Sequence, residues 1–379
     1  MKSVVLTVPG ISYPVFIGAD AAITEQISTL IAGRELMVVT DANVAPHYLE
    51  PMCAALGAAA RIETCVLPAG ESEKTLAGFE RVTDALVGGC LHRDAIVIAL
   101  GGGVIGDLAG FAAACYQRGV AWIVVPTTLL AQVDAALGGK TAINHPAGKN
   151  LIGAFHDPLA VWIDAARLAA LPAREYRAGL GEVVKYGLGF DAAFFAWLEE
   201  NAAALLAREK EALADAIPRC IRLKLEVVAA DRTERGARAL LNLGHTIGHA
   251  LETALGYGVW LHGEAVAVGL VAAAELSAAR GALASEIPAR LRRLLQALEL
   301  PTSVPPEAAD AALNKALALD KKIAAGRLRF IGLAALGRAE IWNNVESVEI
   351  ERAIAATRVG CEWGRAPQPG LRGDLTNGV

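Results

Sequence analysis

Several features that would assign this chain to a familiar class are absent from its 379 residues. The six cysteines are scattered and form no CxxC pair, a spacing that predicts free thiols in a reducing compartment. The first residues lack a long apolar segment followed by a small-residue cleavage site, so no secretory signal is expected. Internal repeats and low-complexity tracts are also missing. We therefore expect a cytoplasmic protein.

Two further absences concern membranes and nucleic acids. The longest apolar run, 95–115, is interrupted by a Gly-Gly-Gly triplet, a further glycine and Asp107, so it fits a strand, a loop and a helix better than a membrane span. The formal net charge is -5. A chain of this charge is not expected to bind nucleic acid over a broad surface, although it can hold a local basic pocket. We predict neither a membrane nor a nucleic acid as partner.

The first half of the chain alternates apolar strands with helical segments. Continuous apolar runs separated by helices favour a parallel sheet with helices on both faces. Strands are expected at 35–41, 61–68, 94–100, 121–126 and 160–164, and helices around 46–56, at 74–87 and after the glycine-rich loop 101–107.

The pattern changes after Leu171-Pro172, where helical stretches begin to dominate. Helices are expected at 175–188, 192–206, 213–229, 239–255 and 262–280, and late strands only at 327–336 and 339–343. The expected fold is an α/β N-terminal Rossmann-like parallel-sheet domain (1–170) followed by a mainly α-helical C-terminal domain (171–360). The remainder, 361–379, is rich in Gly, Pro and polar residues and is expected to be a flexible tail.

The loop GGGVIGD at 101–107 formally satisfies G-x-G-x-x-G with Gly101, Gly103 and Gly106. Glycines there let the backbone approach a pyrophosphate, whose charge meets the helix N-terminus. A glycine-rich turn also serves packing alone, and the spacing does not decide between the two. No acid follows at the usual distance of about twenty residues. Asp41, after an earlier strand, is the best candidate for a ribose contact and would favour NAD over NADP, but it also suits a helix N-cap.

Three of the seven histidines lie close together in the second half of the chain. His245 and His249 are four apart on one face of an expected helix, and His262 follows in the segment LHGEAV. Imidazoles at this spacing suit a divalent metal, which a catalytic site would hold with three protein ligands and an open position. The segment HTIGH lacks the glutamate of HExxH, so metalloprotease chemistry is not supported. Helix histidines satisfied by ordinary hydrogen bonds are the alternative.

Two segments carry lysines in suggestive surroundings. The Gly-rich stretch 138–156 is expected to be a loop with Lys140, Lys149 and Asn150, which suits phosphate but equally a solvated lysine loop.

Glu182 and Lys185 are three apart on an expected helix. They form either a surface ion pair worth roughly 0.2–0.5 kcal/mol or, given the flanking glycines and apolar neighbours, a buried functional pair.

Together these stretches resemble the dehydroquinate synthase family, from about Tyr13 to Gly337. The most specific blocks are GGGVIGDLAGFAAACYQRG, PTTLLAQVDAALGGKTAINHPAGKNLIGAF, ALLNLGHTIGHALE and LHGEAVAVG. The resemblance implies a zinc- and NAD-dependent lyase of the shikimate pathway, which serves aromatic amino-acid biosynthesis. Its substrate would be 3-deoxy-D-arabino-heptulosonate 7-phosphate, a small-molecule sugar phosphate that is closed to 3-dehydroquinate with loss of phosphate.

The resemblance also implies where the metal and the cofactor bind. Zinc, with Co²⁺ as an alternative, would be held by Glu182, His245 and His262, which leaves His249 on the substrate side. NAD contacts would fall at Asp41, Asn43, Glu71, Lys74, Gly102, Gly103, Val104, Ile105, Gly106, Asp107, Thr127, Thr128, Lys140 and Lys149.

Substrate-side positions follow from the same resemblance. They are Asp134, Lys140, Asn150, Lys185, Lys224, Glu234, Arg238, Asn242, His249, Lys321 and Lys322. Arg118 matches a residue that the family supplies from the neighbouring subunit, which implies a homodimer. The chain departs from the family's frequent residues at Asp157, Ala170, Gly181 and Ala237, none of which removes a charged or metal-binding group.

Three competing functions have distinct signatures. A sister cyclase acting on sedoheptulose 7-phosphate would change groups that meet the substrate carboxylate, yet Arg238, Asn242 and His249 keep the family pattern. A metal-dependent NAD alcohol dehydrogenase would not need the phosphate-binding set of Lys140 and Asn150. A non-catalytic binding paralogue should have lost a metal ligand or a lysine, and none is missing.

Overall fold

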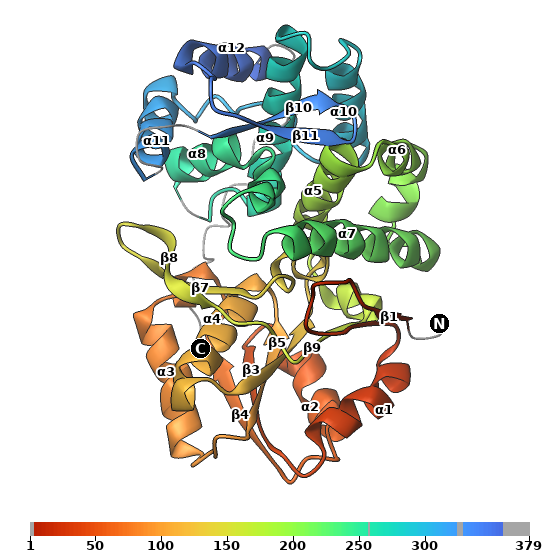
Figure 1. Cartoon of the computed structure of the whole chain (residues 1–379), viewed down its shortest axis with the longest axis vertical. Helices are drawn as coiled ribbons and strands as arrows, with labels where there is room; N and C mark the ends of the chain where they lie inside the picture. Colours follow the sequence, from red (N-terminus) through yellow and green to blue (C-terminus); the bar gives the residue numbers. More distant parts are fainter. Residues whose placement is uncertain (1–3, 257, 324–328, 359–379) are drawn as a thin grey trace, which may run out of the picture.

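The computed structural model describes residues 4–256, 258–323 and 329–358, and for 318–323 the backbone alone. The expected tail, 361–379, lies outside the described residues. Two lobes follow one another along the long axis of the molecule (Figure 1): a sheet lobe, 4–170, and a helical lobe, 173–358. Among the described helices, none has the length and apolar character needed to span a bilayer.

The sheet lobe is built on a seven-stranded sheet of order β1-β2-β9-β6-β5-β3-β4. Its strands are β1 (Val4–Leu6), β2 (Val15–Ile17), β3 (Glu35–Asp41), β4 (Arg61–Leu67), β5 (Ile96–Gly101), β6 (Ala121–Pro126) and β9 (Ala160–Ile163). Neighbouring strands pair in parallel, except that β1 is antiparallel to β2. The five expected strands and the Rossmann-like parallel sheet are confirmed. β1 and β2 were not expected, because three residues are too few to show a periodicity.

Helices cover both faces of this sheet, as predicted. The first face carries α1 (Asp20–Ile31) and α2 (Ala45–Ala55), and the second carries α3 (Leu76–Gly88) and α4 (Gly103–Cys115). Side chains of one strand alternate between the faces, so Val38 packs with α1 and α2 while Val39 packs on the other side. Short helical turns connect the elements: η1 (Glu71–Glu73), η2 (Tyr116–Arg118), η3 (Ala131–Ala135) and η4 (Ala165–Ala170).

The stretch expected as a loop at 138–156 is instead an antiparallel hairpin, so that expectation was wrong. Its strands are β7 (Lys140–His145) and β8 (Gly148–Phe155), and it stands out from the side of the sheet lobe (Figure 1). Thr141 and Ile143 are the buried side chains of β7, and they alternate with the less buried Lys140, Ala142 and Asn144. The many glycines and lysines hid this period-2 pattern.

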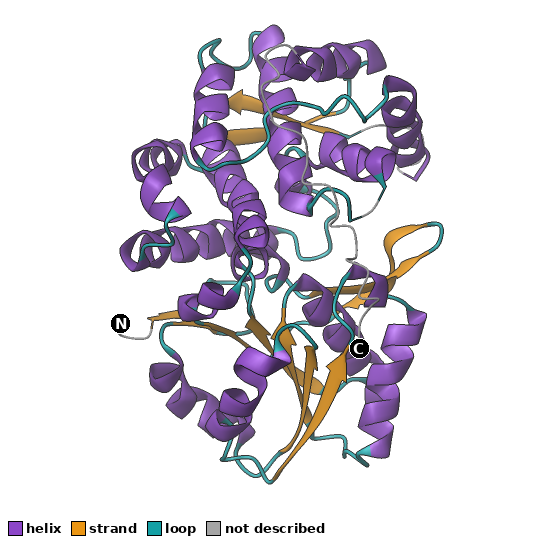
Figure 2. Cartoon of the chain, turned by 180° about the vertical axis from the view of Figure 1, so that it is seen from behind, coloured by secondary structure: helices purple, strands orange, loops and turns teal. Residues whose placement is uncertain are grey.

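The helical lobe contains α5 (Ala173–Phe190), α6 (Ala192–Leu206), α7 (Lys210–Ala230), η5 (Ala237–Asn242), α8 (His245–Leu255), α9 (His262–Ala279), α10 (Ile287–Ala297), α11 (Asp310–Ile323) and α12 (Ser347–Arg358). A small antiparallel pair, β10 (Phe330–Ala335) and β11 (Arg338–Trp342), lies among these helices, as Figure 2 shows from behind. The mainly helical character and the two late strands are confirmed. The single helix expected at 239–255 was wrong: it breaks at Gly244, whose φ of 81° is a left-handed conformation.

One contiguous apolar cluster joins the two lobes. It extends from the α4 face of the sheet into the helical lobe and includes Val97, Leu180 and Val268. α9 is buried on nearly every side, which explains why its apolar residues follow no single stripe.

Candidate functional site

Apart from Lys140 and Lys149, which lie in the hairpin, the predicted cofactor residues stand at or after the carboxyl end of a strand of the sheet. Asp41 and Asn43 come at the end of β3, Glu71 and Lys74 after β4, 102–107 after β5, and Thr127 with Thr128 after β6. These four strands are adjacent in the order β6-β5-β3-β4, and the chain order reverses between β5 and β3. Ligands of open parallel sheets bind at such a reversal point, outside the carboxyl ends. The structure therefore brings these segments to one edge of the sheet.

The glycines of the 101–107 loop serve different purposes. A Cβ on Gly101 would lie 2.7 Å from the side chain of Ile105, so this glycine is required for packing. A Cβ on Gly106 would meet no atom within 4 Å, and one on Gly103 only Ala135 at 3.5 Å. Gly103 and Gly106 lie in the first turn of α4, whose free N–H groups favour an anion. Packing therefore explains Gly101, whereas the approach of a pyrophosphate to Gly103 and Gly106 stays a prediction.

Asp41 stabilises the turn that leads into α2. Its Oδ1 accepts hydrogen bonds from the backbone N–H of Asn43 at 2.9 Å and of Val44 at 3.1 Å. The N-cap residue of α2 is Val44, so the N-cap expected as an alternative for Asp41 is wrong in position. The carboxylate nevertheless satisfies backbone donors just ahead of the helix.

Lys74 connects the glycine loop to the hairpin. Its buried ammonium donates to Asp107 Oδ2 and to Asn150 Oδ1, each at 2.5 Å. Burial raises the pKa of Asp107, and Lys74 opposes that rise. Asn144, which the sequence did not single out, joins the same group, because its amide donates to Glu71 at 2.7 Å and its oxygen accepts from the Asn150 N–H at 3.0 Å. Its place on β7, within hydrogen-bonding distance of Asn150 on β8, depends on the hairpin that the sequence did not reveal.

On the other side of the hairpin, predicted substrate residues contact one another. Lys140 pairs with Glu234, whose second oxygen accepts a hydrogen bond from Asn242 at 2.9 Å. Arg238 is 1% exposed, and its guanidinium donates to the carbonyl of Gly138 at 2.8 Å. The structure thus brings these residues together, with Arg238 turned toward backbone.

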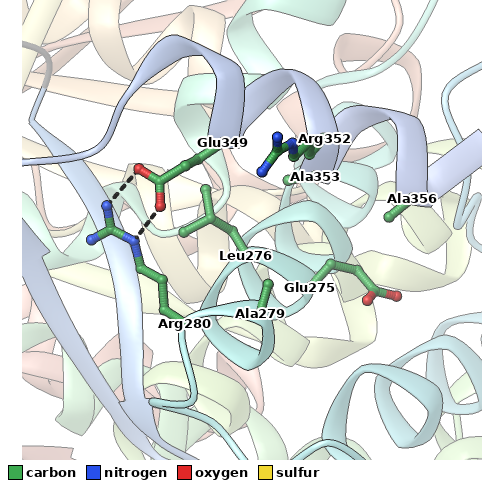
Figure 3. A pocket seen from close by; sticks show the side chains of 8 residues that line it. All are labelled: Glu275, Leu276, Ala279, Arg280, Glu349, Arg352, Ala353 and Ala356. Atoms are coloured by element: carbon green, nitrogen blue, oxygen red, sulfur yellow. Dashed lines mark hydrogen bonds and ion pairs between the residues drawn. The ribbon is translucent and has the colours of Figure 1, made fainter.

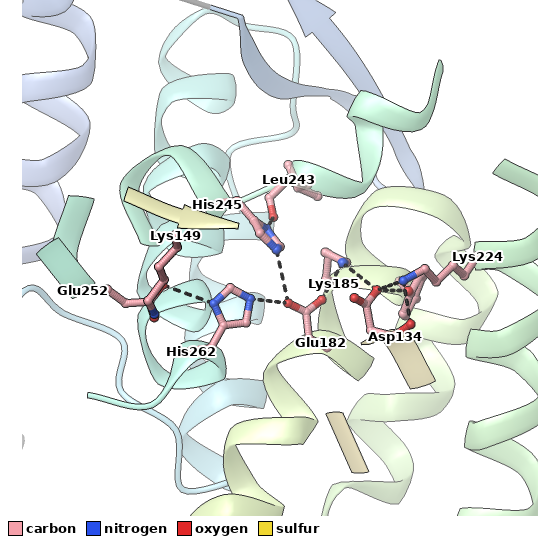
Figure 4. A network of polar contacts seen from close by, with 10 residues as sticks. Asp134, Lys149, Glu182, Lys185, Lys224, Leu243, His245, Glu252 and His262 are labelled. Atoms are coloured by element: carbon pink, nitrogen blue, oxygen red, sulfur yellow. Dashed lines mark hydrogen bonds and ion pairs between the residues drawn. The ribbon is translucent and has the colours of Figure 1, made fainter. Parts of the chain in front are cut away.

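The predicted metal ligands converge from three helices (Figure 4). Glu182 comes from α5, His245 from the first residue of α8 and His262 from the first residue of α9. Glu182 Oε1 lies 3.4 Å from Nε2 of His245 and 3.4 Å from Nε2 of His262. Ligand atoms bound at about 2.0–2.1 Å to a tetrahedral zinc are about 3.3–3.4 Å apart. The two distances from Glu182 match such an ion, and the three donor atoms lie within 4.8 Å of one another.

The surroundings of the three side chains fit a cation as well. Within the described residues neither carboxylate oxygen of Glu182 receives a hydrogen bond, although Lys185 Nζ lies 2.5 Å from Oε2. His245 places Nδ1 3.1 Å from the Leu243 carbonyl, and His262 places Nδ1 3.2 Å from Glu252 Oε2. Each Nδ1 thus faces an oxygen acceptor, which leaves Nε2, on the Glu182 side, as the ring atom that would bind a metal.

The electrostatics favour a charged Glu182 and a neutral His245. Burial would raise the pKa of Glu182, but Lys185 and His245 lower it. Burial lowers the pKa of His245 to about 3, which leaves its Nε2 unprotonated at neutral pH. Burial acts in the same direction on His262, yet its contacts with Glu182 and Glu252 raise the pKa to about 9. The carboxylates thus favour positive charge at this point of the structure.

Glycines beside the ligands bring these helices into backbone contact. A Cβ on Gly263, next to His262, would lie 1.7 Å from the carbonyl oxygen of Ala178 on α5. One on Gly181, next to Glu182, would lie 2.4 Å from the Gly263 oxygen. Gly244, next to His245, is approached equally closely by α9, since a Cβ on Gly269 would lie 1.9 Å from its oxygen. The helix crossings therefore fix the ligand positions.

Asp134 lies at the junction of the lobes, in the single π-helical turn η3. Its Oδ1 accepts from the Tyr186 hydroxyl at 2.6 Å and lies 3.0 Å from Lys224 Nζ and 3.5 Å from Lys185 Nζ. Burial lowers the pKa of Lys224 to about 8, although Asp134 opposes that effect. Tyr186 is not among the predicted residues; its position directly after Lys185 was the only signal available.

Lys149 of β8 pairs with Glu252 at 3.0 Å, and four other predicted residues remain. The exposed His249 ring has its centroid 5.3 Å from that of His245 and 5.7 Å from that of His262, so it joins the cluster. Arg118 is exposed on η2 with a φ of 68°, and among the described residues it has no ion pair. Lys321 and Lys322 lie in α11, but their side chains are outside the described residues.

A separate pocket lies between α9 and α12 (Figure 3). Arg280 and Glu349 form a two-pronged ion pair at its edge, with N–O distances of 2.8 Å and 2.7 Å. The pocket shares no residue with the predicted site.

The family model for the 3-dehydroquinate synthase N-terminal domain matches residues 64–178, and that for the C-terminal domain matches residues 179–323. A 3-dehydroquinate synthase from Shewanella loihica is 47% identical over 345 residues, which cover 91% of this chain and 96% of the relative.

Solved structures that are similar over most of this chain include two cyclases. A 2-epi-5-epi-valiolone synthase from Streptomyces hygroscopicus subsp. jinggangensis, with NAD⁺ and Zn²⁺ bound, has a TM-score of 0.84 at 30% identity and covers 93% of this chain and 99% of its own. A 2-deoxy-scyllo-inosose synthase complexed with carbaglucose-6-phosphate, NAD⁺ and Co²⁺ has a TM-score of 0.84 at 26% identity and covers 94% and 100%.

Proposed function

The chain belongs to the 3-dehydroquinate synthase family, and from that premise we propose that it converts 3-deoxy-D-arabino-heptulosonate 7-phosphate into 3-dehydroquinate and phosphate. One observation carries the proposal. A three-ligand metal constellation, Glu182 with His245 and His262, faces a group of lysines that extends to the nucleotide edge of the sheet. Metal, nucleotide and phosphate chemistry are all needed for this one reaction.

Glu182, His245 and His262 would hold the metal, zinc or alternatively Co²⁺. The 3.4 Å spacing of their donor atoms supports this assignment. When bound, the ion would act as a Lewis acid on the reacting oxygens of the substrate. Lys185 balances the charge of Glu182 from within the buried side of the site.

NAD would lie across the carboxyl ends of β6, β5, β3 and β4. The pyrophosphate would meet the first turn of α4, where Gly103 and Gly106 leave room, and Asp41 would approach the ribose. When bound, NAD would accept a hydride from the C5 hydroxyl carbon and return it after phosphate has left, so the cofactor ends unchanged.

The remaining residues would bind the anionic substrate and manage its protons. Lys140, Asn150, Arg238 and the Lys321-Lys322 segment would hold the phosphate and carboxylate groups. His249, exposed beside the metal ligands, would orient the substrate or transfer a proton. Oxidation at C5 acidifies the neighbouring C–H, and the substrate's own phosphate can take that proton as it is eliminated. Ring opening and an intramolecular aldol step then close the carbocycle.

We also propose a homodimer in which Arg118 reaches the neighbouring site. Its exposure, its lack of an ion pair within the described part of this chain, and the positive φ of Gln117 and Arg118 support this role, because strained turns often carry functional residues. The domain boundary at 170/171 is proposed from the change to helices at α5. The free cysteines of the described residues support a cytoplasmic location.

The test is to incubate the purified protein with the heptulosonate phosphate, catalytic NAD and zinc. We expect one phosphate released per dehydroquinate formed, no net NADH, and loss of both products with a chelator. Glu182→Gln should lose metal and turnover together, whereas Glu226→Gln, on the exposed side of α7, should keep both. Full activity of Glu182→Gln with normal zinc content would contradict the ligand assignment. Phosphate release from sedoheptulose 7-phosphate instead would identify a sister cyclase.

A further inference from the structure

One buried carboxylate beside the proposed metal site has no role in the scheme above. Glu252, on α8, is 5% exposed and seven residues after His245. Its Oε2 lies 3.2 Å from Nδ1 of His262, and its Oε1 accepts a hydrogen bond from Lys149 Nζ at 3.0 Å (Figure 4). A buried carboxylate is costly unless both oxygens are compensated, and here both are.

The contact with His262 determines how that ring presents itself. A carboxylate that accepts from Nδ1–H keeps that proton in place when a metal takes the lone pair of Nε2, and Nε2 lies 3.4 Å from Glu182 Oε1. The ring of His245 is oriented differently, because its Nδ1 faces the backbone carbonyl of Leu243. One ligand is thus oriented by its own main chain and the other by a side chain from a neighbouring helix.

Lys149 adds a connection between the lobes. It comes from β8 of the hairpin in the sheet lobe, whereas Glu252 belongs to the helical lobe. The next hairpin residue, Asn150, accepts the hydrogen bond from Lys74 at the nucleotide edge. Glu252 therefore lies between the proposed cofactor side and one metal ligand.

We propose that Glu252 is a positioning residue for His262: it holds the ring in the Nδ1–H form, directs Nε2 to the metal, and is itself fixed by Lys149 of the other lobe. This inference rests on the proposed function, since it takes His262 as a metal ligand. It assigns to Glu252 no contact with the ion.

The same atoms of Glu252 also belong to a second group of potential metal ligands. His249, Glu252 and His262 also place ligand atoms within 4.8 Å of one another, which is close enough for a cation. Two features argue against a second ion there: Lys149 already occupies one oxygen of Glu252, and Nδ1 of His262 faces the other. The experiment distinguishes the two roles.

The measurement is the affinity of the metal-free full-length protein for Co²⁺ and Zn²⁺, by competition with a chromophoric chelator, together with the visible absorption of the Co²⁺ form. Glu252→Gln preserves the side-chain shape but removes the charge, and Glu252→Ala removes both contacts. Loss of an outer carboxylate partner of a metal-bound histidine usually weakens binding about 10- to 100-fold. We expect the lower end of this range for Glu252→Gln, the upper end for Glu252→Ala, and an altered Co²⁺ spectrum in both.

Glu226→Gln is the matched control and should bind metal as the wild type does. Circular dichroism and thermal unfolding check that each variant is folded; if Glu252→Ala is not, the isosteric Glu252→Gln decides. Wild-type affinity and spectrum in Glu252→Gln would overturn the inference and leave the proposed function intact. Two equivalents of metal in the wild type, with only the second lost in Glu252→Gln, would overturn it in favour of a ligand role. If Glu182→Gln bound metal like the wild type, the proposed function itself would be contradicted.

Discussion

The two lobes position their parts of the site by different physical means. In the sheet lobe the predicted residues follow the ends of β3, β4, β5 and β6, so strand order brings them together and short turns hold them. In the helical lobe the proposed metal ligands lie on α5, α8 and α9, which touch through backbone at glycines adjacent to those residues. Loops at strand ends accept small changes, whereas backbone contacts between buried helices do not. We therefore expect the part of the site in the sheet lobe to tolerate small substitutions and the part in the helical lobe not to tolerate them.

Adding a single methyl group to the helix crossing should have the largest effect. In Gly263→Ala the new Cβ would fall 1.7 Å from the Ala178 oxygen, so α5 and α9 must separate. We expect a loss of about 3 kcal/mol or more in unfolding free energy and loss of stoichiometric zinc, because Glu182 and His262 move apart. Chemical denaturation and metal analysis measure both. Normal zinc content in a stable Gly263→Ala protein would show that the helical lobe tolerates small changes as well as the sheet lobe does.

The same change in the sheet lobe should separate binding from stability. Gly106→Ala meets no atom within 4 Å and lies in α4, so stability should be unchanged or rise by about 0.5–1 kcal/mol. If the pyrophosphate of NAD approaches this turn, the added methyl group should weaken NAD binding about 10- to 100-fold. Each factor of ten corresponds to about 1.4 kcal/mol of binding free energy. Isothermal titration with NAD, alongside thermal unfolding, provides the two readings. An unaltered affinity would contradict the proposed course of the cofactor.

Contacts at the junction of the lobes should respond to pH. Burial lowers the pKa of Lys224 to about 8, so its ammonium loses the proton as pH rises through that value. Deprotonation removes a positive charge beside Asp134, and the KM for the phosphate substrate should rise up to about tenfold per pH unit above 8. Lys224→Arg should shift this rise to higher pH, because a guanidinium stays charged. The test is to measure KM by steady-state kinetics from pH 7 to 10 for the wild type and Lys224→Arg. Identical pH profiles of KM for the two proteins would exclude Lys224 as the titrating group.

An ion pair in the helical lobe away from the glycine crossings should matter least. The Arg280 guanidinium holds the pKa of Glu349 at about 2, against an ordinary value of 4.5. Because the folded-state pKa is the lower one, the stabilisation is present above about pH 4.5 and is lost as pH falls toward 2. Glu349→Gln should cost about 0.5–1 kcal/mol at pH 7, since the pair is partly exposed, and almost nothing near pH 2. Urea denaturation at the two pH values tests this; an effect as large as that of Gly263→Ala would show that ion pairs, too, fix this lobe.

Much of the fold was predictable because its signals are local. The Val- and Ile-rich runs at 35–41 and 121–126 are buried strands whose side chains pack on both faces, so they read as continuous apolar segments. The hairpin at 140–155 was missed because its alternation is masked by glycine and lysine. The break at Gly244 was missed because a glycine inside a helical pattern does not reveal its φ.

The site residues could be predicted where they lie in the sequence segments that resemble the dehydroquinate synthase family. The resemblance named Glu182, His245 and His262 at positions that the structure brings together, whereas spacing alone had pointed to His249 as a ligand. Asn144, Tyr186 and Glu252 were not found. Their importance comes from partners distant in sequence, such as Lys149 for Glu252, and no short pattern encodes such a pair.

The sequence by itself determined the alternation of strand and helix, the parallel sheet, the helical second half and the residue types needed for a metal, a nucleotide and a phosphate. These depend on local propensity, on apolar periodicity and on motif blocks that lie within a few turns of chain. The tertiary structure alone decided the 3.4 Å spacing of Glu182 from each histidine, the partner that orients each imidazole, and the link from Glu252 to Lys149. The reason is that distances between side chains on different helices are set by how closely the backbones pack, and here glycines next to the ligands permit that packing.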